Sequence, residues 1–130
     1  MAKIIDRQDV EDVVTEAVYE GMIVEDEKNA LKTVLSSVVN HPELQPYFSR
    51  ANTVYNERKI LSADGTIHIP DRIEVLPDRN AIIMDYKTGI PLENHAYQIQ
   101  QYAQLLKEMD IVVKQLFLLY INKEVTIIKV

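Results

Sequence analysis

The sequence predicts an α/β fold in which helices flank a mixed β-sheet. Three changes in hydrophobic spacing support this. Apolar residues recur with helical spacing over the first 50 residues, follow strand patterns between about 53 and 87, and return to helical spacing from 93 to 109. Two apolar segments, 112–122 and 125–130, are then predicted to be strands. A helix between the third and fourth strands indicates a crossover, so we expect the fourth strand to run parallel to its neighbour.

The composition is typical of a globular domain with a modest core. The chain has 130 residues, of which 47% are hydrophobic and 26% charged. It has no cysteine, which excludes disulfides, thiolate zinc sites and iron–sulfur clusters. No apolar run approaches the roughly 20 residues of a membrane span, and the N-terminus lacks the apolar region of a signal peptide. We therefore expect one cytoplasmic domain, residues 1–130, with no membrane partner.

Two amphipathic helices are predicted within the first 50 residues. Apolar side chains form one stripe between Val10 and Val18 and a second between Leu31 and Val39, each at i, i+3, i+4, i+7 and i+8. Gly21 is expected to stop the first helix, and Pro42 the second. The acidic residues 25–27 suit the start of the second helix. These helices would lead into a core at residues 52–122.

Three antiparallel strands are predicted at the start of that core. They cover residues 53–61, 66–75 and 81–87. The segments between them, Ala63-Asp64-Gly65 and Pro77-Asp78-Arg79-Asn80, have the composition of turns. Short turns of this kind link consecutive strands as hairpins, so we expect a three-stranded meander.

Two carboxylates occupy positions that the strand pattern assigns to apolar residues. Asp71 interrupts the alternating apolar residues of 67–75, and Asp85 follows an apolar run. If Val75 pairs with Ala81, apolar residues match across the two strands and Asp71 is placed opposite Asp85. Side chains opposed in this way have Cβ atoms roughly 4.5–5.5 Å apart. The register therefore predicts a close pair of acids on the core side of the sheet.

A close pair of acids requires a proton or a cation between them, because the two charges repel. Carboxylate oxygens are hard ligands that suit Mg²⁺ or Mn²⁺. Lys87 lies two residues after Asp85 and therefore points to the same face. There it could orient a water nucleophile or neutralise a phosphate. The alternative is that Asp85 and Lys87 form only an ion pair along one strand at a sheet edge.

Four segments carry a family resemblance. They are Glu57, Pro70-Asp71-Arg72-Ile73, Asp85-Tyr86-Lys87-Thr88-Gly89 and Gln98-Ile99-Gln100-Gln101-Tyr102. Together they resemble the PD-(D/E)xK nuclease superfamily, and within it the RecB-type nuclease domain of helicase–nucleases in DNA recombination and repair. The resemblance covers roughly residues 52–122 and implies a restriction-endonuclease-like core, whose α-β-β-β-α-β order agrees with the elements expected here.

The resemblance implies a role for each residue of the acid cluster. Asp71 and Asp85 would bind Mg²⁺ or Mn²⁺, with the backbone carbonyl of Tyr86 as a further ligand and Glu57 as an outer one. Lys87 would position the attacking water and stabilise charge on the phosphate. A bound divalent ion would lower the pKa of that water and polarise the phosphodiester.

Residues on the following helix would contact DNA. The resemblance implies that Gln98 and Tyr102 line the site, although both could instead only cap the core. His95 lies one turn before Gln98 and is expected to face the substrate. RecB-type domains also carry a metal-binding histidine upstream of the core. Here the upstream histidine is His41, which does not match that motif.

The predicted function is a metal-dependent deoxyribonuclease, of the exonuclease type, forming part of a larger helicase–nuclease. Its partners would be single-stranded DNA ends and the helicase domains. The sequence has no G-x-x-x-x-G-K-[ST] motif, so we expect no ATP site in this chain. A net charge of −6 disfavours a free-standing nucleic-acid binder. The alternative is therefore a catalytically silent domain of the same fold that serves as a structural or DNA-docking module.

Overall fold

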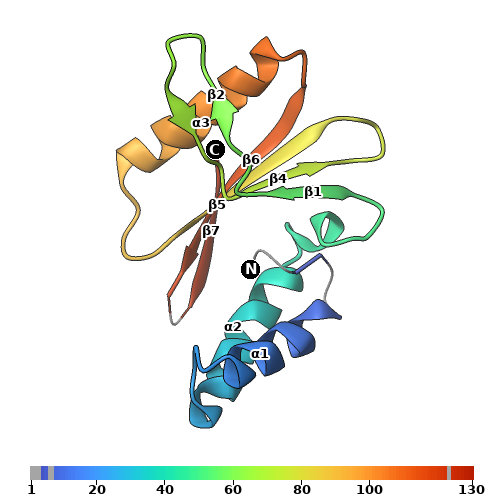
Figure 1. Cartoon of the computed structure of the whole chain (residues 1–130), viewed down its shortest axis with the longest axis vertical. Coiled ribbons are helices and arrows are strands. Elements are labelled where there is room, and N and C mark those ends of the chain that lie inside the picture. The colour runs from blue at the N-terminus through green and yellow to red at the C-terminus, as the bar shows by residue number, and fades with distance from the viewer. Residues whose placement is uncertain (1–3, 6–7, 123) are drawn as a thin grey trace. The chain divides into compact units, whose positions relative to one another are not determined.

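The computed structural model describes residues 4–5, 8–122 and 124–130 and confirms the predicted α/β class (Figure 1). Within these residues a mixed five-stranded sheet and a small two-stranded sheet are accompanied by three α-helices. The helices are α1 (Asp9–Tyr19), α2 (Lys28–Val39) and α3 (Glu93–Glu108), and two short 3-10 helices are η1 (Glu25–Glu27) and η2 (Gln45–Tyr47). None of the described helices has the length and apolar character needed to span a bilayer.

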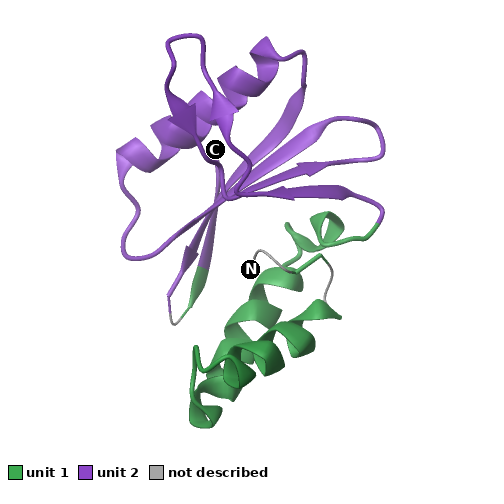
Figure 2. Cartoon of the chain, viewed as in Figure 1, with its two compact units in different colours: residues 1–50, 123–125 green, residues 51–122, 126–130 purple. Residues whose placement is uncertain are grey.

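The chain divides into two compact units (Figure 2). The helical unit comprises residues 1–50 with 123–125, and the sheet unit comprises residues 51–122 with 126–130. In the helical unit, α1 and α2 bury the apolar stripes that the sequence predicts, with Val10 and Val14 on α1 and Leu35, Val38 and Val39 on α2. That the whole chain is one domain stays a prediction.

The five-stranded sheet has the order β1-β4-β5-β6-β7. The neighbouring strands β1, β4 and β5 pair antiparallel, as the predicted meander requires. Strands β5 and β6 pair parallel, which confirms the expected crossover through α3. The strands are β1 (Thr53–Asn56), β4 (Arg72–Val75), β5 (Ala81–Lys87), β6 (Val113–Ile121) and β7 (Val125–Lys129).

Helix α3 packs on one face of this sheet and forms the main core of the sheet unit. Its apolar stripe of Ile99, Tyr102 and Leu106 meets strand residues such as Ile73 and Ile83. Because Ile73 pairs with Ile83 across β4 and β5, both side chains point to the α3 face. The same face continues toward the C-terminal end of β5, where the alternation of side chains also places Asp85 and Lys87.

The first two predicted strands are each interrupted, which corrects their predicted extent. The segment 53–61 divides into β1 and β2 (Ile60–Leu61), and the segment 66–75 divides into β3 (Ile67–His68) and β4. The pieces β2 and β3 form the separate two-stranded sheet and lie beside α3 (Figure 1). The pairing itself is not shifted: Asn56 pairs with Arg72 before the break, and Ile60 with His68 after it.

The break has a local cause on each strand. Glu57 has φ 50°, a left-handed conformation that cannot continue a strand. On the opposite strand, Pro70 has no N–H to donate to a ladder. The hairpin therefore bends at this point, and Ile60 joins the core beside α3. Asp71 lies immediately after the break, at the residue that precedes β4.

Candidate active site

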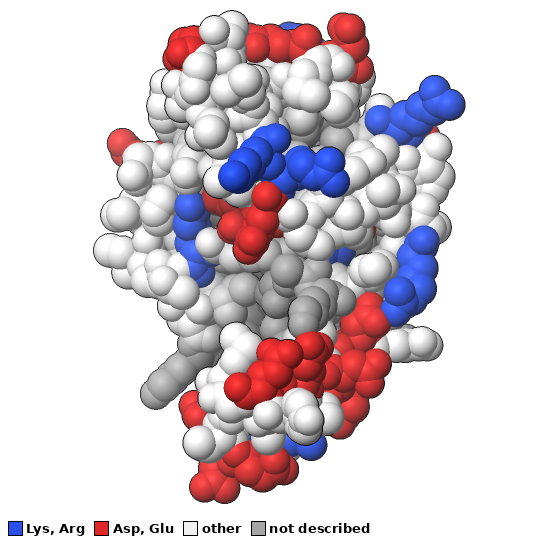
Figure 3. Space-filling view, in the orientation of Figure 1, with Lys and Arg blue, Asp and Glu red and all other residues white. Residues whose placement is uncertain are grey.

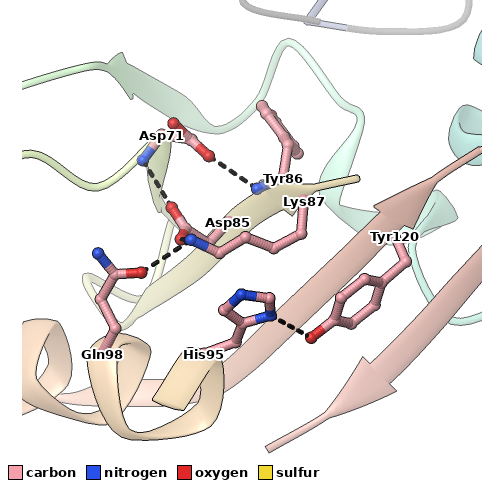
Figure 4. Close-up of polar contacts among 7 residues, drawn as sticks. All are labelled: Asp71, Asp85, Tyr86, Lys87, His95, Gln98 and Tyr120. Atoms are coloured by element: carbon pink, nitrogen blue, oxygen red, sulfur yellow. Dashed lines mark hydrogen bonds and ion pairs between the residues drawn. The ribbon is translucent and has the colours of Figure 1, made fainter. Parts of the chain in front are cut away.

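The predicted register of β4 and β5 is confirmed and brings the two acids together. Val75 pairs with Ala81, and one residue beyond the last paired position of β4 Asp71 adjoins Asp85. The backbone N–H of Asp71 donates to Oδ1 of Asp85 at 3.2 Å. Oδ2 of Asp71 accepts the backbone N–H of Tyr86 at 2.7 Å (Figure 4). Each carboxylate is thus held by the strand that carries the other.

Lys87 connects the acid pair to helix α3. Its Nζ lies 3.0 Å from Oδ2 of Asp85 and donates to Oε1 of Gln98 at 2.8 Å (Figure 4). The ion pair of Asp85 and Lys87 therefore exists, but not at a sheet edge, because β5 lies between β4 and β6. Asp85 is only 2% exposed. The ammonium group is held between a strand acid and a helix amide, which fixes its position.

The environment of the acids favours a proton or another cation. Burial raises the pKa of Asp71 to about 6, and the negative charge of Asp85 adds to the increase. The hydrogen bond from Tyr86 and the charge of Lys87 act in the opposite direction but do not cancel it. The negative charge of the two acids is therefore opposed by a single ammonium group in a largely buried position. A divalent cation would relieve this excess of negative charge.

The donor set fits a hard divalent cation, although it is small. Two carboxylates lie on adjacent strands, each bonded to the backbone of the strand that carries the other, and oxygen donors of this kind suit Mg²⁺, which keeps several water ligands of its own. Across the described residues, no group of three or more His, Cys, Asp and Glu side chains is placed to hold a metal. The protein would thus supply few ligands, and water or substrate oxygens the rest.

Glu57 is not brought into this group. Its backbone N–H donates to the carbonyl of Asp71 at 3.1 Å, but its side chain is exposed. Its role as an outer ligand stays a prediction. The same holds for the backbone carbonyl of Tyr86, whose N–H is bound to Asp71. The side chain of Tyr86 belongs to the opposite face of the sheet, where burial raises its pKa to about 12.

The three predicted substrate residues on α3 have different surroundings. Gln98 binds Lys87 and is part of the site. His95 is half-buried, and its Nδ1 lies 2.9 Å from the hydroxyl of Tyr120 (Figure 4). Tyr102 is only 5% exposed, so it is a residue of the core. Its pKa is raised first by burial and then by the charges of Asp85 and Asp71.

Sequence reasoning missed a second buried charged group, on the other face of β4. Arg72 and Glu74 are both 0% exposed, and Nη2 of Arg72 lies 3.8 Å from Oε1 of Glu74. Burial raises the pKa of Glu74 to about 7, and this effect outweighs the attraction of Arg72. In the sequence, Arg72 and Glu74 flank Ile73, and charged residues that alternate with an apolar one predict a strand face exposed to solvent. Sequence reasoning also missed Tyr120 as the partner of His95, because its position in an apolar strand does not indicate which side chain its hydroxyl group contacts.

No protein-family model and no curated protein matches this chain. Among solved structures, the crystal structure of SSO0001 aligns with a TM-score of 0.42 and 17% sequence identity. The alignment covers 98% of this chain and 63% of that one, so the chain spans less than two thirds of its length. A likeness this weak identifies neither a family nor a function.

Proposed function

We propose that this chain is a divalent-metal-dependent DNA nuclease domain of the RecB type within the PD-(D/E)xK superfamily. The observation that carries the proposal is the cluster of Asp71, Asp85 and Lys87 at the end of β5. Its two acids are linked by hydrogen bonds between their strands, and its lysine forms an ion pair with Asp85. Acids and a lysine in this arrangement suit hydrolysis of an anionic ester.

Asp71 and Asp85 would hold Mg²⁺ or Mn²⁺ through their carboxylate oxygens. When bound, such an ion supplies Lewis-acid activation of water and of the phosphodiester. Lys87 contributes a positive charge that can hold the attacking water and stabilise the phosphate oxygens as negative charge develops. Gln98 accepts a hydrogen bond from Lys87 and thereby keeps its ammonium group beside the acids.

The distribution of charge weakens the objection that the net charge of −6 raises against a nucleic-acid substrate. The sheet unit carries eight Lys and Arg against nine Asp and Glu, a net charge of −1, whereas the helical unit carries six against eleven, a net charge of −5. Figure 3 shows Asp and Glu side chains crowded over the helical unit. The unit that contains the site is therefore nearly neutral. We include single-stranded DNA ends, helicase partner domains and a cytoplasmic location in this proposal.

A silent structural or DNA-docking module is the second candidate function. The observation that favours it is the small donor set, since the described residues place no third acid or histidine beside Asp71 and Asp85. Such a module would keep the fold and would bind Mn²⁺ weakly or not at all. Metal binding and cleavage therefore separate the two candidates.

The test has two measurements on the same protein. Calorimetric titration with Mn²⁺ is expected to show a site that Asp85→Asn weakens strongly. The control is Asp110→Asn, which removes an exposed charge at a position with φ 62°, a conformation that asparagine tolerates. Labelled single-stranded DNA should be cut with Mn²⁺ and left intact with EDTA. If neither metal binding nor cleavage depends on Asp85, the nuclease proposal is wrong.

A further inference from the structure

A cavity of about 470 Å³ lies on the α3 face of the sheet unit, a few residues along β4 from the acid cluster. Ile73 and Val75 form part of its wall. A strand advances about 3.3 Å per residue, so these two side chains lie roughly 7 and 13 Å beyond Asp71. The cavity is thus within reach of the nucleotides next to a phosphate at the acids.

The lining of the cavity combines an apolar floor with two cations. Leu106 of α3 and Ile73 of β4 belong to the apolar part, and Arg58 and Lys59 supply the charge. No Asp or Glu is among the described residues that line it. In a chain with a net charge of −6, this lining is locally positive and suits an anionic ligand that also has an apolar part.

The two cations lie close to the acids in the chain, at the break in the hairpin. Arg58 and Lys59 directly follow Glu57, whose backbone N–H is bonded to the carbonyl of Asp71. The guanidinium carbon of Arg58 lies 5.0 Å from the centre of the Tyr55 ring, a cation–π contact that keeps this side chain at the cavity. Three of the residues that line the cavity, Tyr55, Arg58 and Lys59, are exposed and so available to a ligand.

The rim of the cavity is apolar and open to solvent. Leu61 on the hairpin is 71% exposed and Met109 after α3 is 58% exposed. Exposed apolar side chains gathered at a cavity mark binding sites more often than isolated ones do. The flat faces of an unpaired nucleobase stack on aromatic rings and apolar side chains, and a phosphate lies beside each base, so a nucleotide matches the combination of ring, apolar wall and cations.

We propose that this cavity accepts an unpaired base of the DNA strand next to the phosphate held at the acids. Its adjoining phosphates would bind Arg58 and Lys59, and the base would lie against Tyr55 and the apolar rim. The inference rests on the proposed nuclease function and deepens it: this cavity is the feature that would favour strands with unpaired bases over duplex. A duplex cannot place a base in the cavity without breaking a pair.

The test measures binding without cleavage. The 130-residue protein in EDTA is titrated into labelled oligo-dT, an abasic strand of the same length and a duplex, by fluorescence anisotropy. The abasic strand has the same phosphates without the bases. We expect oligo-dT to bind about tenfold more tightly than the abasic strand. Tyr55→Ala should remove most of that difference, whereas Tyr55→Phe should keep it.

The charge contribution is tested separately with a matched pair of double variants. Arg58→Ala/Lys59→Ala should weaken binding of all strands and reduce the slope of log K against log salt by about 1.4, since each phosphate contact contributes about 0.7. Lys107→Ala/Lys114→Ala removes two exposed charges elsewhere in the sheet unit and should change the slope less. Circular-dichroism melting shows whether each variant is folded.

Two results would overturn the inference: equal binding of oligo-dT and the abasic strand by the wild-type protein, or an equal loss of slope in both double variants. The proposed function fails independently. If oligo-dT binds as expected but Mn²⁺ produces no cleavage, the base-binding role of the cavity is supported and the nuclease function is wrong. If Mn²⁺ supports cleavage while the abasic strand binds as well as oligo-dT, the nuclease function is supported and the base-binding role of the cavity is wrong.

Discussion

Lys87 is the residue whose removal best separates metal binding from chemistry. Its ammonium group touches Asp85 and Gln98. In Lys87→Ala we expect DNA cleavage to be abolished, because the charge that positions water and phosphate is lost. Mn²⁺ binding should be kept, since lysine repels the ion and donates nothing to it. Gel-based cleavage and calorimetry measure the two properties.

Lys114→Ala is the control for that variant, because Lys114 is an exposed lysine on β6, the strand that follows α3. It should cleave DNA at the wild-type rate. Activity that survives in Lys87→Ala would show that the lysine has no part in the reaction. Loss of Mn²⁺ binding in Lys87→Ala would show instead that the variant has damaged the acid pair.

The acids should differ in their effect on the metal. Asp71 is tied to Asp85 and Tyr86 by backbone hydrogen bonds, whereas the exposed side chain of Glu57 stands outside this group. Asp71→Asn should therefore weaken Mn²⁺ binding by at least tenfold, equivalent to about 1.4 kcal/mol, and Glu57→Gln by less. Calorimetry of both proteins gives the order. An equal or larger loss for Glu57→Gln would make Glu57 a direct ligand.

At the level of the elements, the sequence predicts which strands pair, and in which register, better than it predicts where a strand is interrupted. The match of apolar residues fixes the register of Val75 with Ala81, because a slip by one residue would exchange the faces of the sheet. The break at Glu57 has no such signal, since a left-handed glutamate cannot be recognised from its residue type. Pro70 was an available signal, because proline interrupts a ladder, but alternating isoleucines on both sides concealed it.

A buried acid on β4 and a half-buried acid directly before it should make the metal-free protein less stable as the pH rises. The pKa of Glu74 is raised from 4.5 to about 7, and that of Asp71 from 3.8 to about 6, so folding disfavours their charged forms. Their contribution to stability is complete below pH 4 and is lost as the pH rises through 6 and 7. Glu74 alone accounts for at most about 3–4 kcal/mol of this loss, at about 1.4 kcal/mol for each pKa unit.

Glu74→Gln tests that dependence, because glutamine stays neutral at every pH. Urea unfolding in EDTA between pH 5 and 8 should show a smaller decrease in unfolding free energy for the variant than for the wild type. Glu108→Gln, at the exposed end of α3, is the control and should decrease like the wild type. A wild-type protein whose stability increases over this range would contradict the assignment.

For the whole molecule, the sequence predicts which side chains meet but not how charge is divided. The acids, Lys87 and Gln98 meet because strand alternation and helix spacing are local rules. The total of −6 disfavoured DNA binding, whereas the division into units leaves the site-bearing unit at −1. The cavity at Arg58 depends on the bend of the hairpin, so no local pattern of residues could have indicated it.

Tethering the substrate distinguishes a weakly binding nuclease from a silent module. The chain has no cysteine, so Ala63→Cys at the exposed hairpin turn creates a single thiol to which a DNA strand can be joined by a disulfide. The turn lies six residues beyond Glu57, or roughly 20 Å at the rise of a strand, and the linker must span this distance. A tether of matching length raises the effective concentration to about the millimolar range.

We therefore expect the tethered strand to be cut in Mn²⁺ at a rate independent of protein concentration, even where free DNA is cut slowly. The net charge of −6 lowers the affinity of the protein for free DNA, and with a tethered strand this affinity no longer limits the rate of cleavage. The same tether on Lys87→Ala should leave the strand intact, as should EDTA. A tethered strand that survives in the otherwise wild-type protein, with Mn²⁺ bound, would mean that the acids hold a metal without catalysing hydrolysis. The docking-module function would then replace the nuclease.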